Sequence, residues 1–215
     1  MPYTIAIAGI SSALALKVAA ELLKQPNVHV RGTSRDISKL PPFLKDSPRV
    51  TLVQCGPYDT EALRSLIRGC EVVVCCYYAD NETMLEGQKL LVDMCEEEGV
   101  SRYIASDYTS DFTKLDLGDV MVKDPMKHIK AYLDGKPKVN GVHILVGLFM
   151  ETFWGYFDVW DSKEKKLRYW GTGHEEWDLM TYQTAAEYVA AVALDPEAIG
   201  IKKCAFHESF SQNHH

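Results

Sequence analysis

Residues 3–15 read YTIAIAGISSALA. The first six residues form an apolar run that is typical of a buried strand, Gly9 begins a tight turn, and a helical pattern follows as far as Leu23. A strand, a glycine turn and a helix in this order are typical of the unit that opens a dinucleotide-binding sheet. We expect the remainder of the chain to support this turn and to form a pocket next to it.

The turn carries an incomplete glycine fingerprint. Its three positions hold Gly9, Ser12 and Ala15. Alanine fits the last position, which requires only close packing of helix on strand, whereas Ser12 places a side chain where the backbone should approach a pyrophosphate. Two alternatives follow. Either Gly9, Ser11, Ser12 and Ala13 hold a dinucleotide, with the Ser12 hydroxyl bonding a phosphate, or this is an ordinary turn that binds no ligand.

Bulk composition narrows the class of protein. The 215 residues suffice for one core with a small lobe, and 23 basic against 30 acidic side chains give a net charge of −7. An acidic chain without a basic block excludes nucleic acid and anionic membrane as main partners. No leader and no apolar run of membrane-spanning length are found. The six cysteines lack metal-ligand spacing, so we expect buried thiols, a cytoplasmic protein and no metal site.

The tip of the second strand predicts which dinucleotide would fit. Val28–Gly32 is that strand, and Thr33-Ser34-Arg35-Asp36 follows it. An enzyme that uses NAD keeps an acid here for the ribose hydroxyls, whereas a basic side chain suits the 2′-phosphate of NADP. Arg35, assisted by Ser34 and Lys39, therefore favours NADPH; the alternative is a solvated loop of mixed charge.

Repeating strands and helices predict an α/β fold, a Rossmann-like doubly wound parallel sheet. Tyr77 and Tyr78 follow the fourth strand and Ser106-Asp107-Tyr108 follows the fifth, which are ligand-binding positions in such a sheet. The predicted elements are strands at 50–54, 71–76, 102–105 and 142–146, and helices at 59–67 (capped by Asp59), 81–98 (ended by Gly99), 124–133 (capped by Asp124) and 184–194.

Aromatic residues gather after Gly147. We place a boundary there, with residues 1–147 as the dinucleotide-binding domain and 148–215 as a small aromatic-rich substrate lobe packed on it. Residues 169–173 are predicted to form a strand and turn. Such aromatic density suits either a pocket for a flat apolar ligand or a small core with few aliphatic side chains. As a pocket it would be lined by Phe149, Phe153, Trp154, Trp170 and His174.

The sequence resembles the NmrA-like/isoflavone reductase group of atypical short-chain dehydrogenases, especially its fungal members. The resemblance is carried by the Gly9 turn and by these segments, in the expected order: 33–36, Ser106-Asp107-Tyr108, Lys123-Asp124-Pro125-Met126, Gly147-Leu148-Phe149-Met150-Glu151, 169–173 and Ala185-Ala186. It implies a Rossmann-type domain with a substrate lobe, NADPH as cofactor and a small aromatic or enone-like substrate from secondary metabolism.

The same resemblance implies a catalytic lysine on the helix after the fifth-strand loop. Lys127 matches best, with Lys123 and Lys130 as rivals, and Asp107 and Tyr108 lie nearby in sequence. Lys127 and Lys130 share a helix face, so mutual repulsion should lower the pKa of both. The leading hypothesis is an NADPH-dependent reductase. The alternatives are a non-redox cyclase, isomerase or dehydratase, and an NADP(H)-sensing regulatory protein.

Two departures from the family qualify this expectation. Pro57 stands where relatives carry an acid after the third strand, which removes an adenine contact. The chain also stops before its relatives do. We therefore expect a smaller and more open pocket, or a pocket completed by a second subunit of a homodimer.

Overall fold

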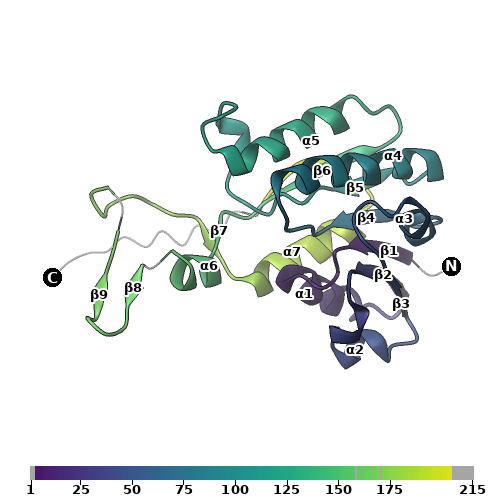
Figure 1. Cartoon of the computed structure of the whole chain (residues 1–215), viewed down its shortest axis with the longest axis horizontal. Helices are drawn as coiled ribbons and strands as arrows, with labels where there is room; N and C mark the ends of the chain where they lie inside the picture. Colours follow the sequence, from purple (N-terminus) through teal and green to yellow (C-terminus); the bar gives the residue numbers. More distant parts are fainter. Residues whose placement is uncertain (1–2, 158, 170, 205–215) are drawn as a thin grey trace.

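The computed structural model describes residues 3–157, 159–169 and 171–204. Its centre is a seven-stranded sheet with the strand order β11-β6-β5-β4-β1-β2-β3, in which every pairing is parallel. This confirms the predicted doubly wound α/β sheet (Figure 1). The strands are β1 (Tyr3–Ala8), β2 (Val28–Ser34), β3 (Val50–Gln54), β4 (Val72–Cys75), β5 (Arg102–Ile104), β6 (Asn140–Leu145) and β11 (Gly200–Lys203).

Helices cover both faces of this sheet (Figure 1). One face packs against α1 (Ala13–Leu22), α7 (Tyr182–Leu194) and the short α2 (Pro42–Lys45), and the other against α3 (Thr60–Ile67), α4 (Gln88–Glu98) and α5 (Asp124–Asp134). Strands buried on both faces must be apolar on both, and β4 is fully buried along its length. The strand order reverses between β1 and β4, the place where such sheets bind ligands.

Helix ends follow the predicted signals in three places and depart from them in one. Asp59 caps α3 by accepting the Ala62 N–H at 3.1 Å, and Gly99 ends α4 in the left-handed conformation. The segment 81–98 is helical throughout, as predicted, and includes the π-helix η2 (Thr83–Gly87) before α4. Asp124 is not the cap of α5, because it lies within the first turn, where its carboxylate accepts the Gly118 N–H at 3.0 Å.

The cysteines behave as core residues. All six are free thiols, and five of them are buried. Burial raises the pKa of Cys70 to about 11 and that of Cys75 to about 12, so these thiols stay protonated and inert at neutral pH. The adjacent Cys75 and Cys76 point to opposite faces of the sheet and belong to separate core clusters.

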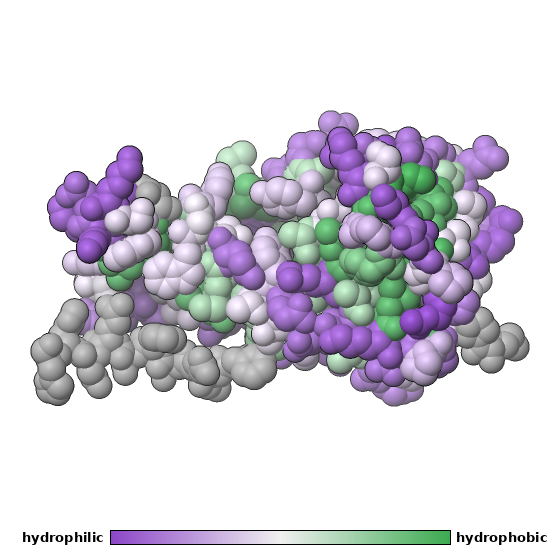
Figure 2. Space-filling view, turned by 90° about the horizontal axis from the view of Figure 1, so that it is seen from below, coloured by the Kyte–Doolittle hydropathy of each residue, from purple (hydrophilic) through white to green (hydrophobic). Residues whose placement is uncertain are grey.

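An arm made of residues 148–180 extends away from the sheet (Figure 1). Its elements are β7 (Leu148–Phe149), α6 (Met150–Gly155), β8 (Trp160–Asp161), β9 (Lys166–Leu167) and β10 (Leu179–Met180). The β8–β9 pair is an antiparallel hairpin that the sequence did not predict, and its end is the hydrophilic tip in Figure 2. Tyr169, predicted to lie in a strand, is in neither hairpin strand.

The chain returns from the arm to the sheet. Helix α7 packs on α1, and β11 pairs with β6 as a seventh strand that the sequence did not predict. Buried Arg102 fastens the returning segment through hydrogen bonds to the Tyr3 hydroxyl and to the carbonyls of Val192, Ala193 and Asp195. Of the described residues after 147, those of α7 and β11 therefore pack on the sheet, while the arm extends away from it.

Candidate functional site

The turn after β1 depends on Gly9. Its φ is +80°, a conformation that L side chains rarely adopt, and an added Cβ would lie 2.9 Å from the Cys76 carbonyl oxygen and 3.1 Å from the Tyr77 ring. The Gly9 N–H donates to Thr33 Oγ1 at 3.1 Å, and the next N–H donates to the Thr33 carbonyl at 2.8 Å. Thr33 on β2 thus holds the turn in place.

Ser12 serves as the N-cap of α1. Its hydroxyl oxygen accepts the Ala15 N–H at 3.2 Å, so the side chain turns back onto the helix. The hydroxyl keeps its own proton for donation to a ligand. The first N–H groups of a helix have no acceptor within it and favour an anion at this end. A serine in the second glycine position is therefore compatible with phosphate binding.

Because Ser12 is a cap, its replacement has a defined cost. We expect Ser12→Ala to lower the free energy of unfolding by about 1 kcal/mol, whereas Ser12→Gly should cost only a few tenths, about 0.3 kcal/mol. Urea denaturation of the three proteins measures the difference. Equal losses in the two variants would contradict the capping role seen for this hydroxyl.

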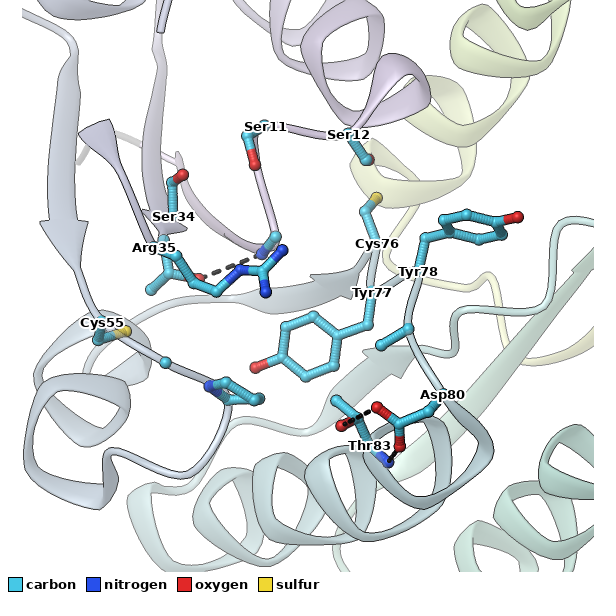
Figure 3. A pocket seen from close by; sticks show the side chains of 15 residues that line it. Ser11, Ser12, Ser34, Arg35, Cys55, Cys76, Tyr77, Tyr78, Asp80 and Thr83 are labelled. Carbon is cyan, nitrogen blue, oxygen red and sulfur yellow. Dashed lines mark hydrogen bonds between the residues drawn. The ribbon is translucent and has the colours of Figure 1, made fainter. Parts of the chain in front are cut away.

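A crevice of about 440 Å³ opens at the carboxyl ends of β1 to β4 (Figure 3). It lies at the point where the strand order reverses, as Rossmann-type sheets require of a dinucleotide site. Its lining combines the turn with residues from three other strand ends: Gly9, Ser11, Ser12, Thr33, Ser34, Arg35, Cys55, Gly56, Pro57, Cys76, Tyr77, Tyr78, Ala79, Asp80 and Thr83.

The tip of β2 presents a cation without a counter-ion. Arg35 is exposed at the crevice and forms no ion pair with any described residue. The adjacent Asp36 carboxylate caps the 3-10 helix η1 (Ile37–Lys39) and accepts hydrogen bonds from the Ser38 N–H and hydroxyl. The bonds from Ser38 and the ion pair with Lys39 lower the pKa of Asp36. Lys39 pairs with Asp36 at 3.1 Å and does not line the crevice.

The tip of β4 brings two tyrosines to the crevice. The Tyr77 ring packs against Gly9 and lines the wall, while its hydroxyl is buried without a hydrogen-bond partner among the described residues. Burial raises the Tyr77 pKa, so the phenol stays protonated. Tyr78 is 95% exposed. Ala13 begins α1 beside the crevice without lining it.

Ser106 does not line the crevice but supports it. Its hydroxyl donates to the Tyr77 carbonyl at 2.8 Å, and its N–H donates to Oε1 of buried Gln88 at 2.9 Å. The predicted cofactor contact of Ser106 is replaced in the structure by this bond between the ends of β4 and β5. Gln88, which is fully buried and follows the π-helix η2, was not predicted as part of the site, because no sequence motif marks it.

Tyr108 and Asp107 are buried, so neither side chain reaches the crevice. Tyr108 has a φ of +38° and its hydroxyl donates to the Cys75 carbonyl at 2.9 Å, a placement that argues against the predicted proton-transfer role. Asp107 Oδ2 lies 2.6 Å from His143 Nδ1 on β6. The sequence predicts His143 only as a strand residue, because no sequence spacing links it to Asp107.

The three candidate lysines have different partners. Lys127 donates to the Leu115 carbonyl in the loop before α5, and Lys130 pairs with Asp134 at 2.6 Å. The two ammonium groups thus have separate partners. Lys123, at the end of the 3-10 helix η4 (Met121–Lys123), donates to Thr109 Oγ1 just beyond β5, and burial lowers its pKa.

The predicted substrate residues lie outside the crevice. Phe149 stacks on Tyr182 with ring centroids 4.2 Å apart. Phe153 is buried in the arm, where it packs against Trp154 and Trp177 at 5.1 and 5.8 Å. Trp154 and His174 are exposed, and Trp170 lies outside the described residues. Phe153, Trp154 and Trp177 thus form an aromatic cluster of the arm, and of these three Phe153 alone is buried.

Two negative findings concern the described residues. No group of three or more potential ligand side chains lies close enough together to hold a metal ion. No helix in these parts of the chain has the length and apolar character needed to cross a membrane.

Solved structures with the same fold include several reductases. AtPrR2 with NADP+ and (+)pinoresinol is 17% identical with a TM-score of 0.75, over 94% of this chain and 70% of that one. An isoflavone reductase is 16% identical with a TM-score of 0.72, over 94% and 69%. A Rossmann-fold NAD(P)-binding family protein from Shigella flexneri is 14% identical with a TM-score of 0.63, over 93% and 90%.

Sequence comparison adds the family. No curated protein matches the chain. The model of the NAD(P)H-binding family matches residues 9–140, which run from the glycine of the first turn to the start of β6. The predicted resemblance to isoflavone reductases is thus confirmed at the level of the fold. By this match, and by the sheet order and turn described above, the chain belongs to the NAD(P)H-binding family.

Proposed function

We propose that this protein is an NADPH-dependent reductase of a small aromatic or enone-like compound. The observation that carries the proposal is the Arg35 guanidinium at the tip of β2, which has no ion pair among the described residues and lines the same crevice as Gly9 and the α1 cap Ser12. A cation at this strand tip suits the 2′-phosphate of NADP, and a glycine turn that leads into a helix N-terminus suits its pyrophosphate.

The crevice residues fit both the pyrophosphate and the 2′-phosphate of NADPH. The turn presents Gly9, Ser11 and Ser12 to the crevice, and the Ser12 hydroxyl, which accepts the Ala15 N–H, can donate its own proton to a phosphate there. Arg35 is available for a 2′-phosphate, while Asp36 is occupied as a helix cap and does not offer its carboxylate to ribose hydroxyls. This arrangement favours NADPH over NADH.

The chemistry needs a hydride and a proton. The reduced nicotinamide supplies the hydride when bound. Of the three lysines on this chain, Lys123 is best placed to supply the proton, because its ammonium lies at the end of β5 and burial lowers its pKa toward the range useful for proton transfer. Lys127, the best match by sequence, bonds the Leu115 carbonyl instead.

Support for the substrate class comes from structures of the same fold. AtPrR2 was solved with (+)pinoresinol, and another neighbour is an isoflavone reductase. Both names denote aromatic compounds. The likeness is one of fold, so the substrate class of this chain is part of the proposal.

A second candidate is an NADP(H)-sensing binding protein without a reaction of its own. It is favoured by one observation: the described aromatic side chains predicted to bind substrate do not line the crevice. A non-redox cyclase, isomerase or dehydratase is favoured by the two glycine positions that hold Ser12 and Ala15.

Calorimetric titration with NADPH and NADH tests the proposal. We expect NADPH to bind at least about tenfold more tightly, a difference of about 1.4 kcal/mol. Oxidation of NADPH is then followed at 340 nm with a panel of enones and aromatic lactones. No binding at millimolar NADPH rejects the proposal. Tight binding without oxidation across the panel favours the sensing protein, and turnover without added NADPH favours the non-redox enzyme.

A further inference from the structure

A buried acid–base pair joins β6 to the segment that follows β5. Asp107 Oδ2 and His143 Nδ1 are 2.6 Å apart, with side-chain exposures of 0% and 2%. The Phe112 ring lies edge-on to the imidazole, with centroids 6.1 Å apart, and closes the pair off from solvent. The pair belongs to neither the crevice nor the aromatic cluster of the arm.

Two of its polar atoms have no partner among the described residues: Asp107 Oδ1 and His143 Nε2. A buried polar atom without a hydrogen bond costs stability, so the pair is not explained by the fold. Burial raises the pKa of Asp107 and outweighs the opposing effects of His143, Lys123 and Lys130. Since its folded pKa exceeds its unfolded one, ionised Asp107 lowers stability at neutral pH.

The charge of Lys123 interacts with this pair. Its ammonium donates to Thr109 Oγ1, two residues beyond Asp107, and the Asp107 charge opposes the effect of burial on its pKa. The other groups that act on Asp107 are Lys130, which is paired with Asp134, and two buried neighbours, Cys75 and Tyr108. Burial keeps those two neighbours uncharged, so after His143 the largest opposing effect on the Asp107 pKa comes from Lys123.

We propose that Asp107 and His143 form a positioning pair that keeps the Lys123 ammonium charged and held at Thr109. In this arrangement His143 donates its Nδ1–H to Asp107 and so keeps the carboxylate ionised despite its burial. The carboxylate in turn stabilises the positive charge on Lys123. The role of Lys123 as proton donor rests on the proposed function, whereas the electrostatic coupling does not.

Competitive acetylation of the free protein tests the coupling. Trace acetic anhydride labels free amines only, and mass spectrometry of the Lys123 and Lys127 peptides across pH 7 to 11 reports the labelling of each. Lys127 is the internal reference because its partner is the Leu115 carbonyl. In Asp107→Asn, we expect Lys123 labelling near neutral pH to rise roughly tenfold relative to Lys127, the effect of losing an opposite charge nearby.

His143 variants separate charge from packing. His143→Asn retains an amide N–H in the place of Nδ1 and should label like the wild type. His143→Leu leaves the carboxylate without a donor, so Asp107 takes up a proton and Lys123 labelling should rise as in Asp107→Asn. Thermal unfolding checks that each variant is folded, and Asp107→Asn, which keeps the side-chain shape, remains informative if the leucine variant unfolds.

Unchanged Lys123 labelling in folded Asp107→Asn overturns the inference, and so does equal labelling in the two His143 variants. NADPH titration of the same samples reports separately on the proposed function. Wild-type protein that binds NADPH while its Lys123 is insensitive to Asp107 refutes only the positioning pair. Coupling without NADPH binding refutes only the reductase.

Discussion

Gly9→Ala should abolish measurable NADPH binding and destabilise the fold. Alanine at a φ of +80° costs about 1–2 kcal/mol, and its Cβ would lie 2.9 Å from the Cys76 carbonyl oxygen, which belongs to the backbone and cannot rotate away. The Gly9 turn must then move away from the end of β4. If two backbone hydrogen bonds to phosphate are lost, at about 1.5 kcal/mol each, affinity falls at least about 100-fold.

Gly56→Ala is the matched control for this experiment. Gly56 lines the same crevice, its φ is not positive, and an added Cβ would meet nothing within 4 Å. We expect this variant to unfold and bind NADPH as the wild type does. Calorimetric titration and urea denaturation of both variants measure the contrast. If Gly9→Ala binds NADPH normally, the turn is not the phosphate site.

Arg35→Ala should remove the preference for NADPH while leaving NADH binding unchanged. Arg35 is exposed, lines the crevice and has no competing ion pair among the described residues, so its guanidinium is available for a 2′-phosphate. A hydrogen bond to a charged group contributes about 1.5–3 kcal/mol, which corresponds to roughly 10- to 100-fold in affinity for NADPH. The loss should shrink at high salt, because exposed charges are screened.

Lys39→Ala provides the comparison for Arg35→Ala. Lys39 has the same charge and lies near the same strand tip, but it pairs with Asp36 and lies outside the crevice lining. Its removal should change NADPH affinity by less than about fivefold, since an exposed pair contributes at most about 1 kcal/mol. Equal losses of NADPH and NADH affinity in Arg35→Ala would mean that the guanidinium does not read the 2′-phosphate.

The fold was predictable because its signals are local. Apolar runs specified β1 to β6, Asp59 and Gly99 marked helix ends, and their alternation implied a parallel sheet. Strand β11 was missed because four residues, Gly200–Lys203, are mostly exposed at the sheet edge and carry no apolar pattern. The β8–β9 hairpin was missed because each of its strands has only two residues.

The crevice was predicted better than the proton-transfer residues. Strand tips in a parallel sheet converge wherever the strands are, so Gly9, Arg35 and Tyr77 could be placed together from sequence alone. Side-chain direction is set by packing, which sequence spacing does not encode. The bond from Lys127 to Leu115, the inward turn of Tyr108 and the contact between Asp107 and His143 all depend on it.

The hydrogen bonds of Arg102 bear on how the polypeptide is made. Its guanidinium joins the Tyr3 hydroxyl to carbonyls of residues 192, 193 and 195, so the first strand is secured by a segment that is translated almost 190 residues later. A nascent polypeptide on the ribosome can pair β1 to β6 but leaves the face beneath α7 bare until that helix emerges. Synthesis of the intervening 148–180 segment thus sets how long this apolar surface stays open to chaperones.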